Sequence, residues 1–444
     1  MVTVNDDAGT QDVTAQRRRL RRVVLSSYLG STFEFYDFLL YASATALVFG
    51  PVFFSGMSPQ TATLASVATF TSGYLARPLG GILFGHFGDR MGRKTTLVVS
   101  MTMMGVATIL IGAIPPPSVL GSWSAVILVI LRLCQGIAVG GEWGGAVLMA
   151  LEHAENSTRR AFYAAFANAG APSGSVLGSL AMAAVALLPR EQFLGWGWRI
   201  PFLLSAVLLV IGLFIRTRVT ESPVFEAAFV QRRNEAKQKP PILEILRKPK
   251  PVILTALGCM ASFSVNAIFA TVGISYAVEA GVSRSFALLA YGICMFIEIF
   301  TVLAFARLAD RIGRRRVLLG GMTGLAVLSY PVFMMLGSGS SVLVLLAFIL
   351  LFPLCHGSNY GPTAAFIAEQ FGTSSRYTGA SLGYQLASLL GGGITPLIVA
   401  ATTAAHSGPA APALPVVAFA IVSLIALLAI RETKGTDLRA APQS

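Results

Sequence analysis

The stretch GHFGDRMGRK, Gly85–Lys94, returns in altered form as FARLADRIGRRRV, Phe305–Val317. Asp89 and Asp310 hold the same place in the two copies and lie 221 residues apart in a chain of 444. Both copies interrupt apolar sequence, and both keep an aspartate, a glycine and closely spaced arginines. A repeat at half the chain length predicts that the protein consists of two related halves.

The composition indicates what these halves are made of. Hydrophobic residues form 55% of the chain, charged residues 12%, and the mean hydropathy is +0.71. Soluble domains carry about 25% charged residues, so this chain has too few charges to cover a water-facing surface. Twelve apolar runs approach the length of a membrane span, about 20 residues, and are centred near residues 38, 72, 104, 137, 172, 206, 265, 296, 326, 355, 388 and 421. The sequence predicts an all-α membrane protein with twelve transmembrane helices in two pseudo-symmetric halves of six.

The predicted organisation follows from these runs and from the polar segments between them. The first run is too long for a secretory signal and lacks a cleavage site of small residues, so it is expected to remain as a span. The parts are a cytoplasmic N-terminal tail (1–22), a six-helix bundle (23–216), a cytoplasmic central linker (217–250), a second six-helix bundle (251–430) and a cytoplasmic C-terminal tail (431–444).

The net charge of +13 is explained by the predicted topology. Of the 33 Lys and Arg residues, 28 fall in segments that face the cytoplasm if the N-terminus does. Short loops rich in Lys and Arg stay on the cytoplasmic side, so we expect both termini to be cytoplasmic and no nucleic acid to be bound. Bases of the linker are also placed to meet anionic lipid headgroups.

Several classes of function lack their residue patterns. The four cysteines form no CxxC pair, so neither a metal site nor a disulfide framework is indicated. No GxxxxGK[ST] loop for ATP is present, and no nucleophile elbow or comparable catalytic constellation appears. We expect no catalytic residues, no metal and no cofactor, and an energy source in an ion gradient.

The charged turns and a second repeated pair predict a conformational latch. Glu152 and Arg159 are seven residues apart after the fourth span, and Glu369 and Arg376 have the same spacing after the tenth. Orientation alone would explain the repeated bases, but not the repeated Asp, Gly and register. The predicted latch consists of Gly85, Asp89, Arg90, Gly92, Arg93, Glu152 and Arg159 in the first half, and Asp310, Arg311, Gly313, Arg314, Glu369 and Arg376 in the second.

Charged residues inside the apolar runs of the first half are candidates for proton coupling. A charge at the bilayer centre costs several kcal/mol, and therefore marks a functional site by default. Counting about 1.5 Å per residue puts Asp37, Arg77 and Arg132 in one central layer, with Glu142 nearer the cytoplasm. These charges either pair to hold spans together or include a carboxylate that changes protonation during transport. The predicted proton-coupling residues are Asp37, Glu34, Arg132 and Glu142.

The second half has fewer such residues. Glu298 occupies the repeat position of Arg77, and its apolar runs add Asn266 and His356. A lone histidine is more often a packing residue than a proton carrier, and Tyr36 and Tyr41 are equally open to a packing role. The predicted substrate-binding residues are Arg77, Arg132, Tyr36, Tyr41, Asn266, Glu298 and His356.

The motifs resemble those of a known group. GHFGDRMGRK and ARLADRIGRRR are similar to the two loop signatures of the major facilitator superfamily, and LRLCQGIAVGG (Leu131–Gly141) resembles its fourth-span motif. The resemblance ties the arginine of that motif, Arg132, to proton coupling, and makes Asp89 part of a latch against the other half. FEFYDF (Phe33–Phe38), YLARPLGGILFGHFGDRMGRK, GGEWGGA and GWGWRIPF (Gly195–Phe202) resemble the metabolite:proton symporter family.

The resemblance covers about residues 23–432 and implies the major facilitator fold and alternating access. It implies proton-coupled import of a small polar metabolite, such as an organic acid of the shikimate, 2-oxoglutarate or citrate type. We expect a monomer in the bacterial inner membrane whose partners are protons, lipids and a small molecule. Two alternatives remain, a proline/glycine betaine symporter and a proton antiporter for drugs or metabolites on the same fold.

Overall fold

The computed structural model describes residues 6–154, 157–218, 241–373, 375–395, 398–399, 402 and 408–436. Parts of the predicted tails and most of the central linker, residues 219–240, lie outside the described residues. Every regular element in the described part of the chain is a helix. Because a bilayer offers no partner for backbone N–H and C=O groups, helices that satisfy these groups internally are the form expected of an apolar chain.

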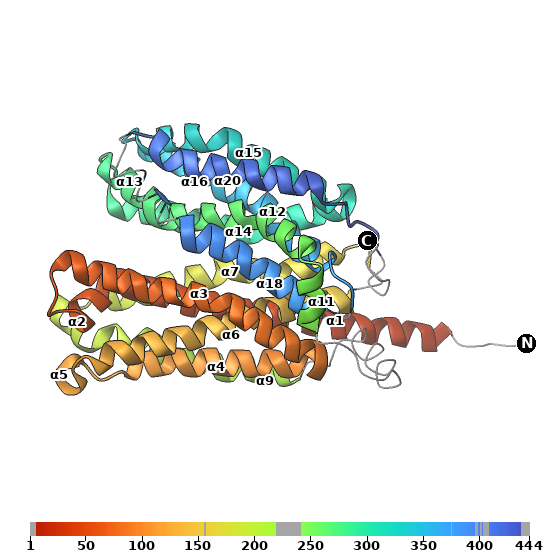
Figure 1. Ribbon diagram of the computed structural model, residues 1–444, viewed down its shortest axis with the longest axis horizontal. Helices are drawn as coiled ribbons and strands as arrows, with labels where there is room; N and C mark the ends of the chain where they lie inside the picture. The colour runs from red at the N-terminus through yellow and green to blue at the C-terminus, as the bar shows by residue number, and fades with distance from the viewer. Residues whose placement is uncertain are drawn as a thin grey trace, which may run out of the picture.

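The first half of the chain forms one bundle (Figure 1). Long helices span it in alternating directions, and short elements join them at the two ends. The label η marks a π-helical segment. The elements of this half are α1 (Asp6–Ala44), η1 (Thr45–Phe49), α2 (Gly50–Phe53), α3 (Pro59–Met91), α4 (Arg93–Ala113), α5 (Pro117–Leu120), α6 (Trp123–His153), α7 (Arg160–Ala186), α8 (Arg190–Gln192), η2 (Phe193–Gly197) and α9 (Arg199–Thr217).

The second half forms another bundle, drawn above the first in Figure 1. The short helix α11 (Pro241–Arg247) precedes it and contacts α3 and α18. Its elements are α12 (Lys250–Ile268), η3 (Phe269–Gly273), α13 (Ile274–Glu279), α14 (Arg284–Ile312), α15 (Arg314–Leu336), α16 (Ser341–Ile349), η4 (Leu350–His356), α17 (Gly357–Ala368), α18 (Arg376–Ser388), η5 (Leu389–Ile394) and α20 (Ala410–Ala429).

Each of the twelve predicted spans corresponds to a helical segment. Nine helices in the described residues are long and apolar enough to cross a membrane, and the bent pair Arg18–Ala44 and Leu47–Phe53 makes a tenth. The other two are α3 and the α18–η5 segment, which are more polar. The reason is their place, since α3 packs against α18 between the two bundles and faces protein there rather than lipid. On the side of α3 that does not face the other bundle, Leu75 and Leu79 are apolar and exposed.

The bundles meet along three helices of the first half, α3, α6 and α7, and their partners in the second. Helix α7 packs against α14 and α17, and α18 packs against α3 and α6. Figure 1 shows the start of α1 and the stretch after α20 at one end of the molecule, here called the terminal face, where the turns at Gly92 and Gly313 also lie. Both glycines have a positive φ, 107° and 108°, which glycine adopts without the steric cost of a side chain. The two copies of the charged turn therefore share one backbone shape.

Small residues allow close helix packing inside the first bundle. A Cβ atom on Gly136 or Gly140 of α6 would overlap the backbone carbonyls of Gly73 and Arg77 on α3. Membrane helices associate through such close backbone approach, because lipid leaves little hydrophobic drive between them. The glycine-rich sequence of α6 thus fixes how near α3 can lie.

Candidate functional site

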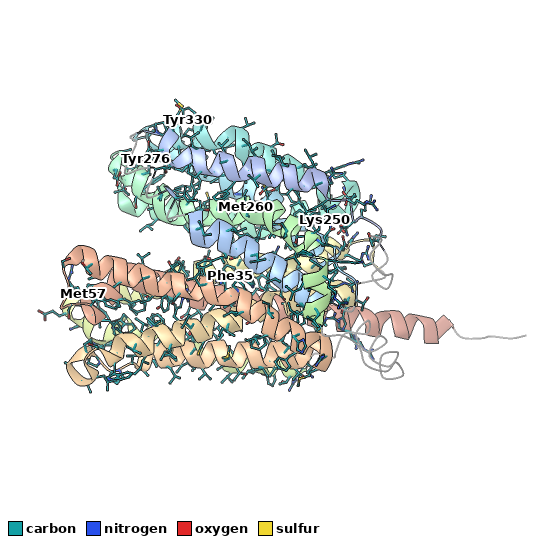
Figure 2. All side chains as sticks on the ribbon, in the orientation of Figure 1. Phe35, Met57, Lys250, Met260, Tyr276 and Tyr330 are labelled. Carbon is teal, nitrogen blue, oxygen red and sulfur yellow. The ribbon has the colours of Figure 1, made fainter. Side chains whose placement is uncertain are left out.

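A cavity lies between the two bundles. Figure 2 places Phe35, one of its lining residues, about midway between the terminal face and the opposite end, where Met57 and Tyr276 lie. Both halves contribute to the lining, which consists of Phe35, Phe38, Tyr74, Arg77, Ala171, Pro172, Ser175, Phe263, Asn266, Ala267, Met295, Glu298, His356, Tyr360, Tyr384, Ser388 and Gly392. The cavity is thus a central chamber with aromatic walls and a few polar groups, as small-molecule sites commonly are.

Arg77 provides the positive charge in this chamber. Its Nη1 donates a hydrogen bond of 3.1 Å to Ser388 Oγ of the second half. Its guanidinium lies 4.4 Å from the ring centre of Tyr74 and 5.2 Å from that of Phe38, a geometry in which cation–π attraction helps to hold a buried charge. Arg77 is therefore fixed in position and connects the two halves at the chamber.

A carboxylate–imidazole pair lies in the chamber wall of the second half. Glu298 of α14 and His356 of η4 are joined through Glu298 Oε1 and His356 Nδ1. The His356 ring stacks on Tyr360, with centroids 5.1 Å apart, and the Tyr360 and Tyr384 hydroxyls are hydrogen-bonded at 2.8 Å. Among the predicted substrate-binding residues, Arg77, Asn266, Glu298 and His356 line this chamber.

Three other predicted binding residues are not in the chamber lining. The Tyr36 hydroxyl donates to the carbonyl of Pro201 at 3.0 Å, and Tyr41 is fully buried in the apolar core of the first bundle. The Arg132 guanidinium lies 4.0 Å from the Tyr41 ring centre and 5.1 Å from that of Phe70. Aromatic side chains thus enclose Arg132 inside the first bundle, away from the chamber.

Asp37 lies in a second cavity, inside the first bundle, together with Arg132. Its Oδ2 accepts a hydrogen bond of 2.8 Å from Thr108, and its Oδ1 accepts one of 2.7 Å from Ser205. Gln135 donates to the Thr108 hydroxyl at 2.7 Å and accepts from Arg132 Nη1 at 3.2 Å. Among the described residues, the carboxylate of Asp37 has no ion pair. A chain of neutral hydrogen-bonding groups, rather than a direct contact, connects this acid to Arg132.

Glu142 forms an ion pair with Arg216, the last residue of the predicted first bundle. The Arg216 Nη2 atom, in the last turn of α9, donates to Glu142 Oε1, and Arg216 Nη1 donates to the Leu97 carbonyl at 3.2 Å. Both side chains are buried, with exposed fractions of 4% for Arg216 and 0% for Glu142. Arg216 was counted with the cytoplasmic bases because it stands at the end of the sixth apolar run, and that position did not indicate that its side chain turns inward to Glu142.

At the terminal face, ion pairs cross between the halves. Glu152 of the first half binds Arg93 at 2.8 Å within its own half and Arg376 of the second at 3.3 Å. Glu369 of the second half binds Arg314 at 3.2 Å and Arg160 of the first at 3.8 Å. Each glutamate thus joins one arginine of its own half to one of the other.

Asp310 adds a contact of another kind. Its two carboxylate oxygens accept hydrogen bonds of 3.0 Å from the backbone N–H groups of Ala161 and Phe162, at the start of α7. A helix N-terminus leaves such groups unpaired and favours a negative charge. Asp310 also pairs with Arg314 at 3.1 Å, so the second charged turn binds the first half directly.

The remaining predicted latch residues take several positions. A Cβ on Gly85 would overlap the backbone of Thr378, so this glycine permits the close approach of α3 and α18. Arg90, Arg159 and Arg311 are exposed, and Arg160, next to Arg159, makes the contact across the halves. The side chain of Asp89 lies outside the described part of the structure. Burial raises the pKa of the Glu369 carboxyl, and Arg314 opposes this by stabilising the ionised form.

Residues 24–384 and 258–443 match the Major Facilitator Superfamily model. The chain is 39% identical to the shikimate transporter of Escherichia coli (strain K12) over 90% of this chain and 91% of that protein. It is 30% identical to the proline/betaine transporter of the same organism, over 86% of this chain and 77% of that protein. The solved structure of the proton:xylose symporter XylE from E. coli bound to 6-bromo-6-deoxy-D-glucose is 17% identical, covers 96% of this chain and 98% of its own, and has a TM-score of 0.73.

Proposed function

The chain belongs to the Major Facilitator Superfamily, and we propose that it is a proton-coupled symporter that imports a small polar metabolite such as an organic acid. It is a membrane transporter and not an enzyme. The finer proposal covers the coupling ion, the direction and the substrate class, with compounds of the shikimate, 2-oxoglutarate or citrate type as candidates. The single observation that carries it is the central chamber, in which Arg77 is the positive charge held for a ligand.

The chamber supports a substrate with a carboxylate. A guanidinium presents N–H groups in a fork that matches carboxylate geometry. Within the described part of the chain, only one of the Nη atoms of Arg77 forms a hydrogen bond, to Ser388. The rings of Tyr74 and Phe38 next to Arg77 limit its contact with water and so strengthen its attraction for an anion. The lining from both halves would let substrate binding pull the bundles together.

Proton coupling is proposed from the surroundings of Asp37. Its carboxylate is buried at 5% exposure and held by hydroxyl groups, without a cation in direct contact among the described residues. Keeping an unpaired charge in such a place is costly, and binding a proton removes that cost. Asp37 is therefore suited to gain and lose a proton, and Arg132 acts on it through Gln135.

Alternating access is proposed to depend on the terminal face. With both termini cytoplasmic, as the distribution of Lys and Arg predicts, the ion pairs of Glu152 and Glu369 close the cytoplasmic side. Opening toward the cytoplasm requires the Glu152–Arg376 and Glu369–Arg160 pairs to separate, together with the contact of Asp310 with α7. We place the protein in the bacterial inner membrane, working as a monomer.

A second candidate substrate class is a zwitterion such as proline or glycine betaine. The chamber carries Glu298 as well as Arg77, and its aromatic walls favour a cationic group by cation–π attraction. The 30% identity to a proline/betaine transporter points the same way. This reading makes Glu298, rather than Arg77, the residue that determines selectivity.

The test is uptake into proteoliposomes under an imposed inward proton gradient. Labelled shikimate, 2-oxoglutarate, citrate, proline and glycine betaine are offered with and without a protonophore. Accumulation of an organic acid that the protonophore abolishes is expected. Accumulation of only proline or betaine would favour the second candidate, and uptake that never exceeds the external concentration would refute symport.

A further inference from the structure

The first bundle has a continuous polar face of α1 that the substrate chamber does not use. Ser26, Ser27, Gly30, Glu34 and Asp37 follow one another at steps of three or four residues, except for the adjacent pair Ser26 and Ser27, and so lie on one side of the helix. From Ser26 to Asp37 the helix rises about 16 Å. This face looks into the first bundle, since α1 packs against α6 and α9 there.

Two cavities lie along this face. The inner one is lined by Glu34, Asp37 and Arg132, among others. The other lies near the terminal face and is lined by Val23, Ser26, Ser27, Lys94, Leu97, Ala146, Met149 and Arg216. Between the cavities stands the buried pair of Glu142 and Arg216.

Arg216 lies next to Glu142 and also next to the turn of α1 that precedes Glu34. The position of Gly30, one turn before Glu34, is covered by the Arg216 guanidinium, so that a Cβ there would overlap it. The charged groups that interact with Glu34 are Glu142 of α6, Arg77 of α3, Arg216 of α9 and Asp37 of its own helix. Arg216 thus lies between the Glu34 turn of α1 and Glu142.

Two carboxylate oxygens in this region lack a hydrogen-bond partner among the described residues. They are Oε2 of Glu34 and Oε2 of Glu142, and the exposed fractions of these residues are 4% and 0%. A buried acceptor without a partner costs about 1–3 kcal/mol or more when charged, and such exceptions call for a reason. An oxygen that receives a proton during transport has such a reason to be left without a partner.

We propose that the first bundle contains its own proton exit, which runs from Glu34 past the Glu142–Arg216 pair to the cavity near the terminal face. The proposal rests on the proton symport proposed above. A proton held on Glu34 moves to Oε2 of Glu142 when Arg216 withdraws from that carboxylate, and then to solvent in the cavity at Ser26 and Ser27. Glu34 and Glu142 return to their ionised forms, and Arg216 closes the route by binding Glu142 again.

The route is separate from that of the substrate, and one residue is common to both. Arg77 lines the central chamber and also the inner cavity of Glu34 and Asp37. A substrate carboxylate that binds Arg77 weakens the attraction of Arg77 for Glu34, and so favours a proton on Glu34. Substrate loading and proton loading are coupled at Arg77, whereas the two leave by different paths.

The double variant Glu142→Gln/Arg216→Gln tests the route, because it removes both charges and leaves no unpaired one. A one-unit pH gradient coupled to one proton supports about tenfold accumulation. The variant is expected to lose that accumulation, with a ratio near one, while still exchanging labelled for unlabelled substrate. If the pair only braces the helices, two amides keep accumulation at the wild-type ratio, and that result would overturn the proposal.

A single variant distinguishes loss of the proton route from a folding defect in the double variant. Glu34→Gln changes a side chain without an ion pair among the described residues, so it should fold, and the same loss of accumulation with retained exchange is expected. Glu279→Gln, exposed at the opposite end of the molecule, is the matched control, and Arg216→Lys should keep accumulation by keeping the charge. Wild-type-like proton flux in Glu34→Gln would overturn the proposal.

The same experiment separates the two proposals. Shikimate is the first probe, followed by the other compounds of the panel. A wild-type protein that accumulates none of them with protons refutes the symport itself, and the exit with it. If the wild-type protein accumulates substrate with protons and both variants do so to the same extent, the proton exit is refuted while the proposed symport stands.

Discussion

Glu152 of the first half and Arg376 of the second form an ion pair of 3.3 Å across the boundary between the bundles. The same carboxylate holds Arg93 of its own half at 2.8 Å. In the repeat, Glu369 holds Arg314 and Arg160 in the same manner. The two halves are therefore fastened by crossed pairs, in which each half supplies one glutamate and one arginine to its partner.

The first prediction concerns this fastening. Glu152→Gln leaves Arg93 and Arg376 buried without their carboxylate, and the loss of one partner of a buried pair costs about 3–5 kcal/mol. The terminal face should open in more of the molecules. Spin labels at the exposed positions Met91 and Ile312, one in each half, should show a longer distance population by pulsed electron resonance. Glu279→Gln serves as the control, and an unchanged distance distribution would contradict the latch.

The second prediction concerns Arg77. Arg77→Gln should raise the KM for a carboxylate-bearing substrate about tenfold or more, since a hydrogen bond to a charged group contributes about 1.5–3 kcal/mol. Ser388→Ala removes only the partner of its Nη1 and should raise KM severalfold. Initial rates of substrate exchange measure both. An unchanged KM in Arg77→Gln would remove this residue from the binding site.

The third prediction concerns Glu298. A substrate with a second carboxylate would meet the Glu298 charge in the chamber. Glu298→Gln keeps a hydrogen-bonding group toward His356 but removes that charge. Inhibition of shikimate uptake by citrate and 2-oxoglutarate should therefore become stronger. Inhibition constants equal to those of the wild type would show that Glu298 does not face the substrate.

The fourth prediction concerns helix packing. Gly140→Ala places a methyl group against the Arg77 carbonyl and forces α3 away from α6. Overpacking of this kind costs about 1–3 kcal/mol, so the melting temperature in detergent should fall by several degrees. Gly292 of α14 has open space where a Cβ would lie, and Gly292→Ala is the matched control. Equal melting temperatures for the two variants would contradict the close contact of α3 and α6.

The architecture could be predicted from the sequence because its signals are local. Runs of apolar residues gave the spans, and the repeat of Asp89 at Asp310 gave the two related halves. The same apolar runs contain predicted substrate-binding residues that line the chamber, such as Arg77 and Glu298. Helices α3 and α18 are more polar than the other spans, and the apolar runs near residues 72 and 388 nevertheless indicated both of them.

The pairing of side chains could not be predicted, because it depends on contacts between segments far apart in the chain. Glu152 meets Arg376 rather than Arg159, and Arg160 rather than Arg159 reaches the other half, a difference of one residue and therefore of about 100° around the helix. Arg132 shares the depth of Arg77 but is enclosed by Tyr41 and Phe70. Depth can be counted along a sequence, whereas the direction in which a side chain faces depends on its neighbours in space.

The central claim is that substrate entry carries protons through Asp37. Its most direct test is proton flux into proteoliposomes that contain a trapped pH-sensitive dye. The substrate is the first compound of the uptake panel that the wild-type protein accumulates, and it is added outside without an imposed pH gradient. The account predicts that the interior acidifies with wild-type protein, and that Asp37→Asn still exchanges substrate but produces no acidification. Acidification by Asp37→Asn at the wild-type rate, or wild-type uptake without proton movement, would contradict it.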